Sequence, residues 1–339
     1  MSTAELTETK LTETKRSETM AAHPNPALTL RGVTLGYGER TVVGPVDLDI
    51  PAAQTTAIIG ANGCGKSTLL RGLTRQLPLQ SGTVEVLGRS VEGWPARDYA
   101  RTVALLPQSP VAPEGMTVEQ LVDRGRHPHR GWFGSSSRMD TEAVARALEL
   151  TDLVELAGRD ITELSGGQRQ RAWLALVLAQ QTPVILLDEP TSYLDLSHQV
   201  ELMDLVRSLP DPTVPTTAGT TASTAPSSTA GQDEAERPRR ATVVAVLHEL
   251  NLAARTADHV IAMADGQVAA AGTPTEVLTP DLLLEVFGLD ADVVRDPLLG
   301  HPVVLPRTAA DRASAQEQGL VTEPPSGDTL PSAPREDLR

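Results

Sequence analysis

The chain has 339 residues, of which 40% are apolar and 2% aromatic, and its formal net charge is −15. This composition supports one sizeable α/β domain with additions, packed by Leu, Val and Ala, and it disfavours nonspecific nucleic-acid binding, which requires a basic surface. The single cysteine, Cys64, excludes an internal disulfide and a cysteine-caged zinc site.

Targeting and membrane-spanning segments are not evident in the sequence. The N-terminus lacks the apolar core of a signal peptide, and no window holds the ~18 uninterrupted apolar residues that a membrane-spanning helix needs. We therefore expect a cytoplasmic chain, whose role at a membrane would be carried by a partner.

The N-terminal part begins as a polar tail and then turns to strands. Residues 1–26 are rich in Thr, Glu and Lys, which predicts a disordered segment. Residues 28–35 and 41–50 alternate like an antiparallel pair, and residues 55–59 form the β-branched apolar run of a buried strand. A helix is predicted over 67–73.

Strands and helices alternate along the rest of the chain, with two polar interruptions. A Pro-, Thr-, Ser-, Ala- and Gly-rich run at 210–240 predicts a low-complexity surface insertion, and residues 306–339 predict a second disordered tail. Further strands are expected at 84–86, 102–106, 184–187, 242–247, 259–263 and, as an edge strand, 268–270. Further helices are expected from a capped start at Thr117, and at 140–150, 167–180, 199–209, 252–257 and 276–287, the last closing the fold.

Residues 60–68 match the phosphate-binding loop G-x-x-x-x-G-K-[ST], between a predicted strand and a predicted helix. Glycines let successive N–H groups point at phosphate oxygens, and the helix adds its positive end. We expect Lys66 to reach the β and γ phosphates and the Ser67 hydroxyl to bind Mg²⁺. The predicted nucleotide-binding residues are Gly60, Asn62, Gly63, Cys64, Gly65, Lys66, Ser67 and Thr68.

Two carboxylates follow the apolar run at 184–187. Open α/β sheets bind ligands at the carboxyl ends of their strands, so Asp188 and Glu189 are expected at that rim. Asp188 suits the Mg²⁺ shell, and Glu189 suits polarising an attacking water. His248 ends the strand at 242–247 and would reach the same rim if the two strands are neighbours. An acidic turn and an ordinary strand-end histidine are the plainer alternatives.

Ser165, Gly166, Gly167 and Gln168 precede a long predicted helix. In one interpretation Ser165 is an ordinary N-cap. In the other, the segment is a second anion-binding helix N-terminus. Two phosphate sites in one chain would be redundant unless they face each other across a dimer.

Taken together, these motifs resemble the nucleotide-binding subunit of an ABC transporter. The resemblance implies a P-loop α/β ATPase core with an antiparallel β-subdomain and a helical subdomain inserted at about 112–165, within one ATP-binding domain over 27–305. The residues that carry it, in matching order, are Tyr37, Lys66, Gln108, Ser165, Asp188, Glu189, Asp195 and His248.

The same resemblance implies a role for each motif residue. Tyr37 would stack on adenine, and Gln108 would link Mg²⁺ to a membrane partner. Asp195 would be the D-loop residue, and His248 would contact the γ-phosphate. Two subunits would pair head to tail, so that Ser165 of one chain completes the site of the other. The implied catalytic set is Glu189, His248, Gln108 and Lys66; the metal ligands are Ser67, Gln108 and Asp188; the cofactors are ATP and Mg²⁺.

Residues 118–122, 124–129, 169–173 and 194–199 resemble the importer ATPases for ferric siderophores, with haem and cobalamin importers as close alternatives. The resemblance covers about 28–305, with departures at Tyr193, at Glu249 and in the insertion. It implies that a transmembrane permease holds this chain at the cytoplasmic face of the cell membrane. It also implies a substrate-binding protein as an indirect partner, and no nucleic acid.

Other classes remain open at this point. A P-loop small-molecule kinase would explain Lys66, Ser67 and Asp188 but would leave the Ser165 motif and His248 without a role. A soluble ABC protein acting on ribosomes or DNA is disfavoured by the single phosphate loop and the lack of sustained heptads. The His-containing loop at 124–130 lacks a third metal ligand nearby, so we interpret it as solvated or partner-facing.

Overall fold

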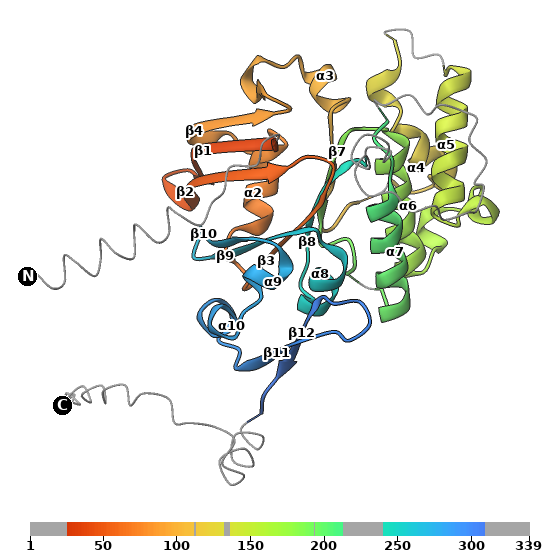
Figure 1. Ribbon diagram of the computed structural model, residues 1–339. Coiled ribbons are helices and arrows are strands. Elements are labelled where there is room, and N and C mark those ends of the chain that lie inside the picture. The colour runs from red at the N-terminus through yellow and green to blue at the C-terminus, as the bar shows by residue number, and fades with distance from the viewer. Residues whose placement is uncertain (1–25, 112, 132–135, 193, 213–239, 309–339) are drawn as a thin grey trace, which may run out of the picture.

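The computed structural model describes residues 26–111, 113–131, 136–192, 194–212 and 240–308 (Figure 1). Most of the two predicted tails and of the predicted insertion, together with Tyr193, lie outside the described residues. The described part forms two main sheets, a group of helices beside them and a C-terminal hairpin. Among these residues, none of the helices combines the length and the apolar character that crossing a bilayer requires.

The first sheet is antiparallel, with the strand order β2-β1-β4-β5. Strands β1 (Pro26–Tyr37) and β2 (Arg40–Pro51) form the predicted hairpin. Strand β4 (Leu79–Val86) is longer than predicted, and β5 (Arg89–Ser90) was missed. Two residues are too few for the alternation that identifies a strand in a sequence.

The second sheet has the strand order β10-β9-β3-β8-β7-β6. Its strands pair in parallel except for β10, which lies antiparallel at the edge, as predicted. Every residue of β3, β7 and β8 is buried, as expected for parallel strands covered on both faces. The strands are β3 (Thr55–Gly60), β6 (Val103–Leu106), β7 (Val184–Asp188), β8 (Thr242–Val246), β9 (His259–Ala264) and β10 (Gln267–Gly272).

Two apolar clusters flank this sheet, because successive side chains of a strand point to opposite faces. Ala57 and Ile59 of β3, together with Ala245 of β8, belong to the cluster on the face that most of the later helices cover. Ile58 and Val244, which alternate with them, belong to the cluster under the antiparallel sheet. The six-stranded sheet is therefore the central layer, and the two clusters hold the flanking layers against it.

The helical layer lies on the other side of the central sheet from the antiparallel sheet (Figure 1). Thr117 caps its first helix through reciprocal hydrogen bonds with Gln120, which confirms the predicted start. Helix α7 begins three residues earlier than predicted, because Asp195 caps it. The helices of this layer are α4 (Val118–Arg124), α5 (Arg138–Leu150), α6 (Gly166–Ala179), α7 (Leu196–Ser208) and α8 (Leu250–Thr256), and the short 3₁₀ turns are η1 (Val91–Gly93), η2 (His127–His129), η3 (Val154–Leu156) and η4 (Ile161–Glu163). Two further helices, α2 (Lys66–Leu73) and α3 (Ala96–Ala100), pack in the cluster under the antiparallel sheet.

The prediction of one closing helix over 276–287 is wrong for the C-terminal part. That part contains two helices, α9 (Pro274–Val277) and α10 (Pro280–Phe287). Thr279 Oγ1 accepts a hydrogen bond from Leu282 N (3.3 Å) and Pro280 occupies the first turn, so a new helix begins there. The described fold then closes with a hairpin of β11 (Ala291–Arg295) and β12 (Pro302–Pro306), which was not predicted from the sequence.

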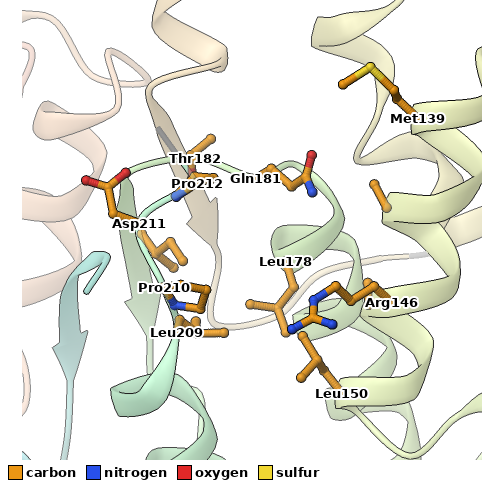
Figure 2. Close-up of a pocket in the computed structure, with 13 residues that line it drawn as sticks. Met139, Arg146, Leu150, Leu178, Gln181, Thr182, Leu209, Pro210, Asp211 and Pro212 are labelled. Carbon is orange, nitrogen blue, oxygen red and sulfur yellow. The ribbon is translucent and has the colours of Figure 1, made fainter. Parts of the chain in front are cut away.

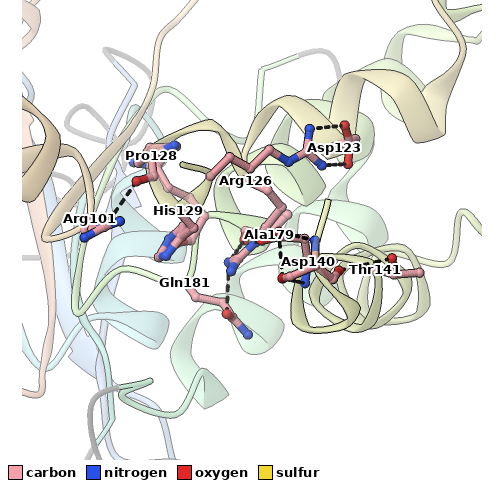
Figure 3. Close-up of polar contacts among 12 residues, drawn as sticks. Arg101, Asp123, Arg126, Pro128, His129, Asp140, Thr141, Ala179 and Gln181 are labelled. Atoms are coloured by element: carbon pink, nitrogen blue, oxygen red, sulfur yellow. Dashed lines mark hydrogen bonds and ion pairs between the residues drawn. The ribbon is translucent and has the colours of Figure 1, made fainter. Parts of the chain in front are cut away.

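The segment around η2 is a polar junction between helices (Figure 3). The Arg126 side chain is buried, pairs with Asp140 at the start of α5 (Nε to Oδ1, 2.9 Å) and donates to Ala179 O at the end of α6 (2.7 Å). His129 Nε2 lies 2.7 Å from Gln180 O. The expectation of a solvated or partner-facing loop is therefore wrong for Arg126, which joins α4, α5 and α6.

Candidate functional site

The phosphate-binding motif lies between β3 and α2, as predicted. Gly65 is the N-cap of α2 with φ 106°, and this end of the helix has no side-chain cap and no acidic residue in its first turn. A Cβ on Gly60 would lie 2.3 Å from Met263 O, which is closer than any side chain tolerates. The loop therefore presents uncapped backbone N–H groups at a helix N-terminus, an arrangement that binds anions.

Lys66 lies at the base of this loop and is only 5% exposed. Its Nζ donates hydrogen bonds to Gly60 O (2.8 Å) and Ala61 O (2.9 Å). Cys64 is also buried, and its Sγ lies 4.0 Å from the same Nζ. The Lys66 ammonium is thus held inside the loop, close to the position expected for phosphate oxygens.

Ser67 and Asp188 form a hydroxyl–carboxylate pair at the same end of the sheet. Ser67 Oγ donates to Asp188 Oδ1 (3.0 Å), and Asp188 is the last residue of β7. Burial raises the pKa of Asp188 above its usual value; the Ser67 hydrogen bond opposes this shift, and the neighbouring Glu189 charge adds to it. Hydroxyl and carboxylate oxygens at this spacing fit the ligand set of Mg²⁺.

Glu189 and His248 meet at the adjacent position on the rim. His248 Nε2 lies 2.6 Å from Glu189 Oε1, and Ser192 Oγ donates to Glu189 Oε2 (3.3 Å). Burial by itself would raise the pKa of Glu189, but hydrogen bonds from His248 and Gln108 outweigh it and lower that pKa. Glu189 is therefore an ionised carboxylate, held in place and able to accept a hydrogen bond from water.

These groups surround one cavity of about 490 Å³. Its wall includes residues from the phosphate loop together with Gln108, Glu189 and His248, so the structure brings together the whole predicted catalytic set. Asp188 is not part of the wall and contacts it through Ser67. Val42 of β2 was not predicted, because a valine in a strand gives no sign that its hairpin covers the loop. The full lining is Val42, Asn62, Gly63, Gly65, Lys66, Ser67, Thr68, Gln108, Glu189 and His248.

Tyr37 lies next to this cavity but not in its wall. It is 48% exposed, and its hydroxyl accepts a hydrogen bond from Arg71 Nη1 (3.0 Å). Hydrogen bonds with Arg71 and then Thr68 lower the pKa of Tyr37. The ring is thus at the surface beside the loop, and its predicted role in stacking stays a prediction.

The Ser165 segment is absent from the cavity wall. Ser165 Oγ accepts from Gln168 N (3.3 Å), and Ser165 N donates to Gln168 Oε1 (3.1 Å), so both side chains cap α6. Ser165 and Gly166 are exposed. The plainer interpretation, an N-cap, is confirmed; whether this end also binds phosphate stays a prediction.

Asp195 lies beside that exposed helix end. Its Oδ1 accepts from His198 N (3.0 Å) as the cap of α7. A Cβ built on Gly167 would lie 3.1 Å from a methyl carbon of Leu194, which places the turn before Asp195 against the first turn of α6. Like Ser165, Asp195 lies outside the wall of the loop cavity.

A second cavity, of about 570 Å³, lies between α5, the end of α6 and residues 209–212 (Figure 2). Leu150, Leu178 and Leu209 contribute to a largely apolar wall, and Arg146 contributes a charge. None of the predicted site residues lines it, so size alone would misplace the functional site.

Comparisons with known proteins agree with the geometry. Residues 43–192 match the family model described as ABC transporter. The chain is 43% identical to the petrobactin import ATP-binding protein FpuD of Bacillus anthracis, over 83% of this chain and 93% of the relative. It is 41% identical to the ferric enterobactin transport ATP-binding protein FepC of Escherichia coli (strain K12), over 84% and 97%. It also matches the solved structure of a metal-chelate type ABC transporter in an inward-facing conformation, with a TM-score of 0.66, 25% identity and coverage of 84% and 99%.

Proposed function

Since this chain belongs to the ABC transporter family, as an ATP-hydrolysing subunit, we propose that it energises uptake of an iron(III)–siderophore complex through a separate transmembrane permease. The observation that carries the enzymatic part is that Lys66, Glu189 and His248 line one cavity, whose wall also includes Ser67, the hydrogen-bond partner of Asp188. A small-molecule kinase would need no residue like His248 beside Glu189.

Each of these residues has a separate role in ATP binding and hydrolysis. Lys66 and the loop N–H groups bind the β and γ phosphates. Ser67 and Asp188, with Gln108 of the cavity wall, would hold Mg²⁺, which would supply charge neutralisation at the phosphates when bound. Glu189 accepts a hydrogen bond from the attacking water and polarises it, and His248 holds Glu189 while facing the γ-phosphate.

A second copy of the chain would complete each site. The wall of the cavity lacks Ser165 through Gln168, which are held at the start of α6. In a head-to-tail pair, that helix end would face the nucleotide bound to the partner's loop. ATP would then join the two subunits, and hydrolysis would release them.

The cargo and the membrane partner follow from relatives rather than from this chain's own contacts. FpuD is named for petrobactin import, and FepC is named for ferric enterobactin transport. We infer that this chain is held at the cytoplasmic face of the cell membrane by a transmembrane permease, and that a substrate-binding protein acts indirectly through that permease. Import of haem or of cobalamin is the alternative function. Measuring the uptake of iron–siderophore, haem and cobalamin in cells that lack this chain distinguishes the three functions.

The composite site is tested by removing two equivalent helix caps. Ser165→Ala and Thr117→Ala each break a capping box and should each cost about 1 kcal/mol of folding free energy. Only Ser165→Ala should lower ATP turnover, measured as phosphate release per chain. Turnover per chain should also rise with protein concentration. Full activity of a highly diluted wild type, with Ser165→Ala unaffected, would contradict the proposal.

A further inference from the structure

The C-terminal hairpin is hydrogen-bonded to the helix that follows His248. Asn251 lies in the first turn of α8, and its side-chain amide contacts one residue of β12 twice. Val304 N donates to Asn251 Oδ1 (2.7 Å), and Asn251 Nδ2 donates to Val304 O (3.2 Å). Val304 is 3% exposed. The Asn251 amide therefore provides the hydrogen bonds that a neighbouring strand would otherwise give to the N–H and C=O of this buried residue.

The register of the hairpin explains why Val304 has these groups available. Asp296 N donates to His301 O (2.8 Å), and hydrogen-bonded pairs recur at every second residue along an antiparallel ladder. Val304 is opposite Val293, which falls between such pairs. Its N–H and C=O therefore point away from β11, and Asn251 is the group that meets them.

We propose that Asn251 is a positioning residue for His248 and that the hairpin of β11 and β12 is its anchor. Just before His248, Leu247 N donates to Ile58 O of β3 (3.1 Å). The short main-chain stretch that carries His248 is therefore held at one end by the central sheet and at the other by the hairpin. Its imidazole faces Glu189 at 2.6 Å, so a small shift of α8 would break that contact.

This inference rests on the proposed function, because it assigns the hairpin a part in the hydrolysis proposed above. Leu252 and Ala253 of α8 are buried in a core cluster that also contains Ala57 and Ala245 of the central sheet, so the hairpin is not their only support. Loss of the Asn251 contacts should therefore displace the start of α8 without unfolding it. Misplacement of a catalytic group by about 1 Å costs up to about 100-fold in rate.

The test compares Asn251→Ala with the wild-type full-length chain in ATP hydrolysis. We expect kcat to fall by roughly 10- to 100-fold, with an unchanged KM for ATP and unchanged binding of a fluorescent ATP analogue, because Asn251 does not line the cavity. Asn251→Asp keeps the acceptor for Val304 N and should give an intermediate kcat. Leu298→Ser, at the 91% exposed hairpin tip, is the matched control and should leave kcat unchanged.

A double-mutant cycle distinguishes positioning of His248 from a merely structural role. In a His248→Ala background, measured under single-turnover conditions with excess protein, Asn251→Ala should cause no further loss. A further loss equal to that in the wild type would overturn the inference, as would an unchanged kcat in Asn251→Ala alone. If Asn251→Ala does not fold, Asn251→Asp replaces it in both measurements, in the wild-type and in the His248→Ala background. A wild type that fails to hydrolyse ATP contradicts the proposed function, whereas an active wild type with an insensitive Asn251 contradicts only this inference.

Discussion

His248 Nε2 lies 2.6 Å from Glu189 Oε1, although the two residues follow different strands of the central sheet. Strands β7 and β8 are parallel neighbours, and their register places Asp188 opposite Val246. The residues that come just after each strand therefore emerge side by side at the same edge. The contact is a consequence of strand order and register, and it joins the group that would polarise water to the group that would face the γ-phosphate.

Glu189→Gln should bind ATP normally and turn it over at least about 100-fold more slowly, because the amide keeps the shape of the carboxylate but not its charge or basicity. The variant should accumulate as an ATP-bound dimer, since hydrolysis is the step that releases the pair. Phosphate release and size-exclusion chromatography with and without ATP measure the two effects. Hydrolysis at the wild-type rate would remove Glu189 from the catalytic role.

Lys66→Ala should abolish tight ATP binding or turnover. The Lys66 ammonium is buried within the loop, so its removal deletes the positive charge closest to the expected phosphates. Arg75→Ala is a suitable control, because the Arg75 guanidinium stacks over the Tyr99 ring, away from the cavity. Binding of a fluorescent ATP analogue and phosphate release check both variants. Unchanged activity in Lys66→Ala would contradict the phosphate-loop assignment.

Asp140 should make the stability of the fold depend on acidic pH (Figure 3). Burial by itself raises its pKa, but hydrogen bonds from Ser137 and Arg126, together with the Arg126 charge, lower the pKa to about 2. A carboxyl with a lower pKa in the folded than in the unfolded state stabilises the fold above about pH 4 and loses that contribution as the pH falls towards about 2. The free energy of unfolding should therefore decrease over this range in the wild type.

Asp140→Asn should flatten that acidic dependence and, at neutral pH, destabilise the fold by about 3–5 kcal/mol, because the buried Arg126 loses its counter-charge. Asp123→Asn is the matched control, since Asp123 pairs with Arg130 nearer the surface and should cost no more than about 1 kcal/mol. Denaturant unfolding at several pH values measures both. If the free energy of unfolding changed equally with acidic pH in Asp140→Asn and in the wild type, Asp140 would not be the source of the pH dependence.

Residues 213–239 should be dispensable for ATP hydrolysis. The residues that flank this segment, Pro210 and Arg240, are opposite each other in an antiparallel bridge. Replacing the segment by Asn-Gly leaves a four-residue loop (Asp211, Pro212 and the two new residues) between the bridged pair, which can close without moving α7 or β8. Arg240 should be kept, because its Nη2 lies 3.2 Å from Asp258 Oδ2. We expect kcat and the melting temperature to stay at wild-type values; failure of the shortened chain to fold would show that the segment is structural.

Prediction from the sequence succeeded where a signal is local. The glycine pattern before Lys66 and the reciprocal cap at Thr117 each specify their own backbone within a few residues, and both were found in place. It failed where the signal is short or depends on distant pairing. Thr279 and Pro280 do signal a new helix, but they were merged into a longer apolar pattern. The hairpin that carries Val304 was missed because the contacts that support it come from α8.

Motif spacing along the chain was enough to name the nucleotide-binding loop, the carboxylates at the end of an apolar strand and the family they resemble, because each of these features is encoded in consecutive residues. The meeting of Glu189 with His248, the cover of Val42 over the loop and the separation of Ser165 from that cavity were decided by tertiary structure alone. The physical reason is that strand order and register in a parallel sheet are chosen by packing on both of its faces, which no single stretch of sequence contains.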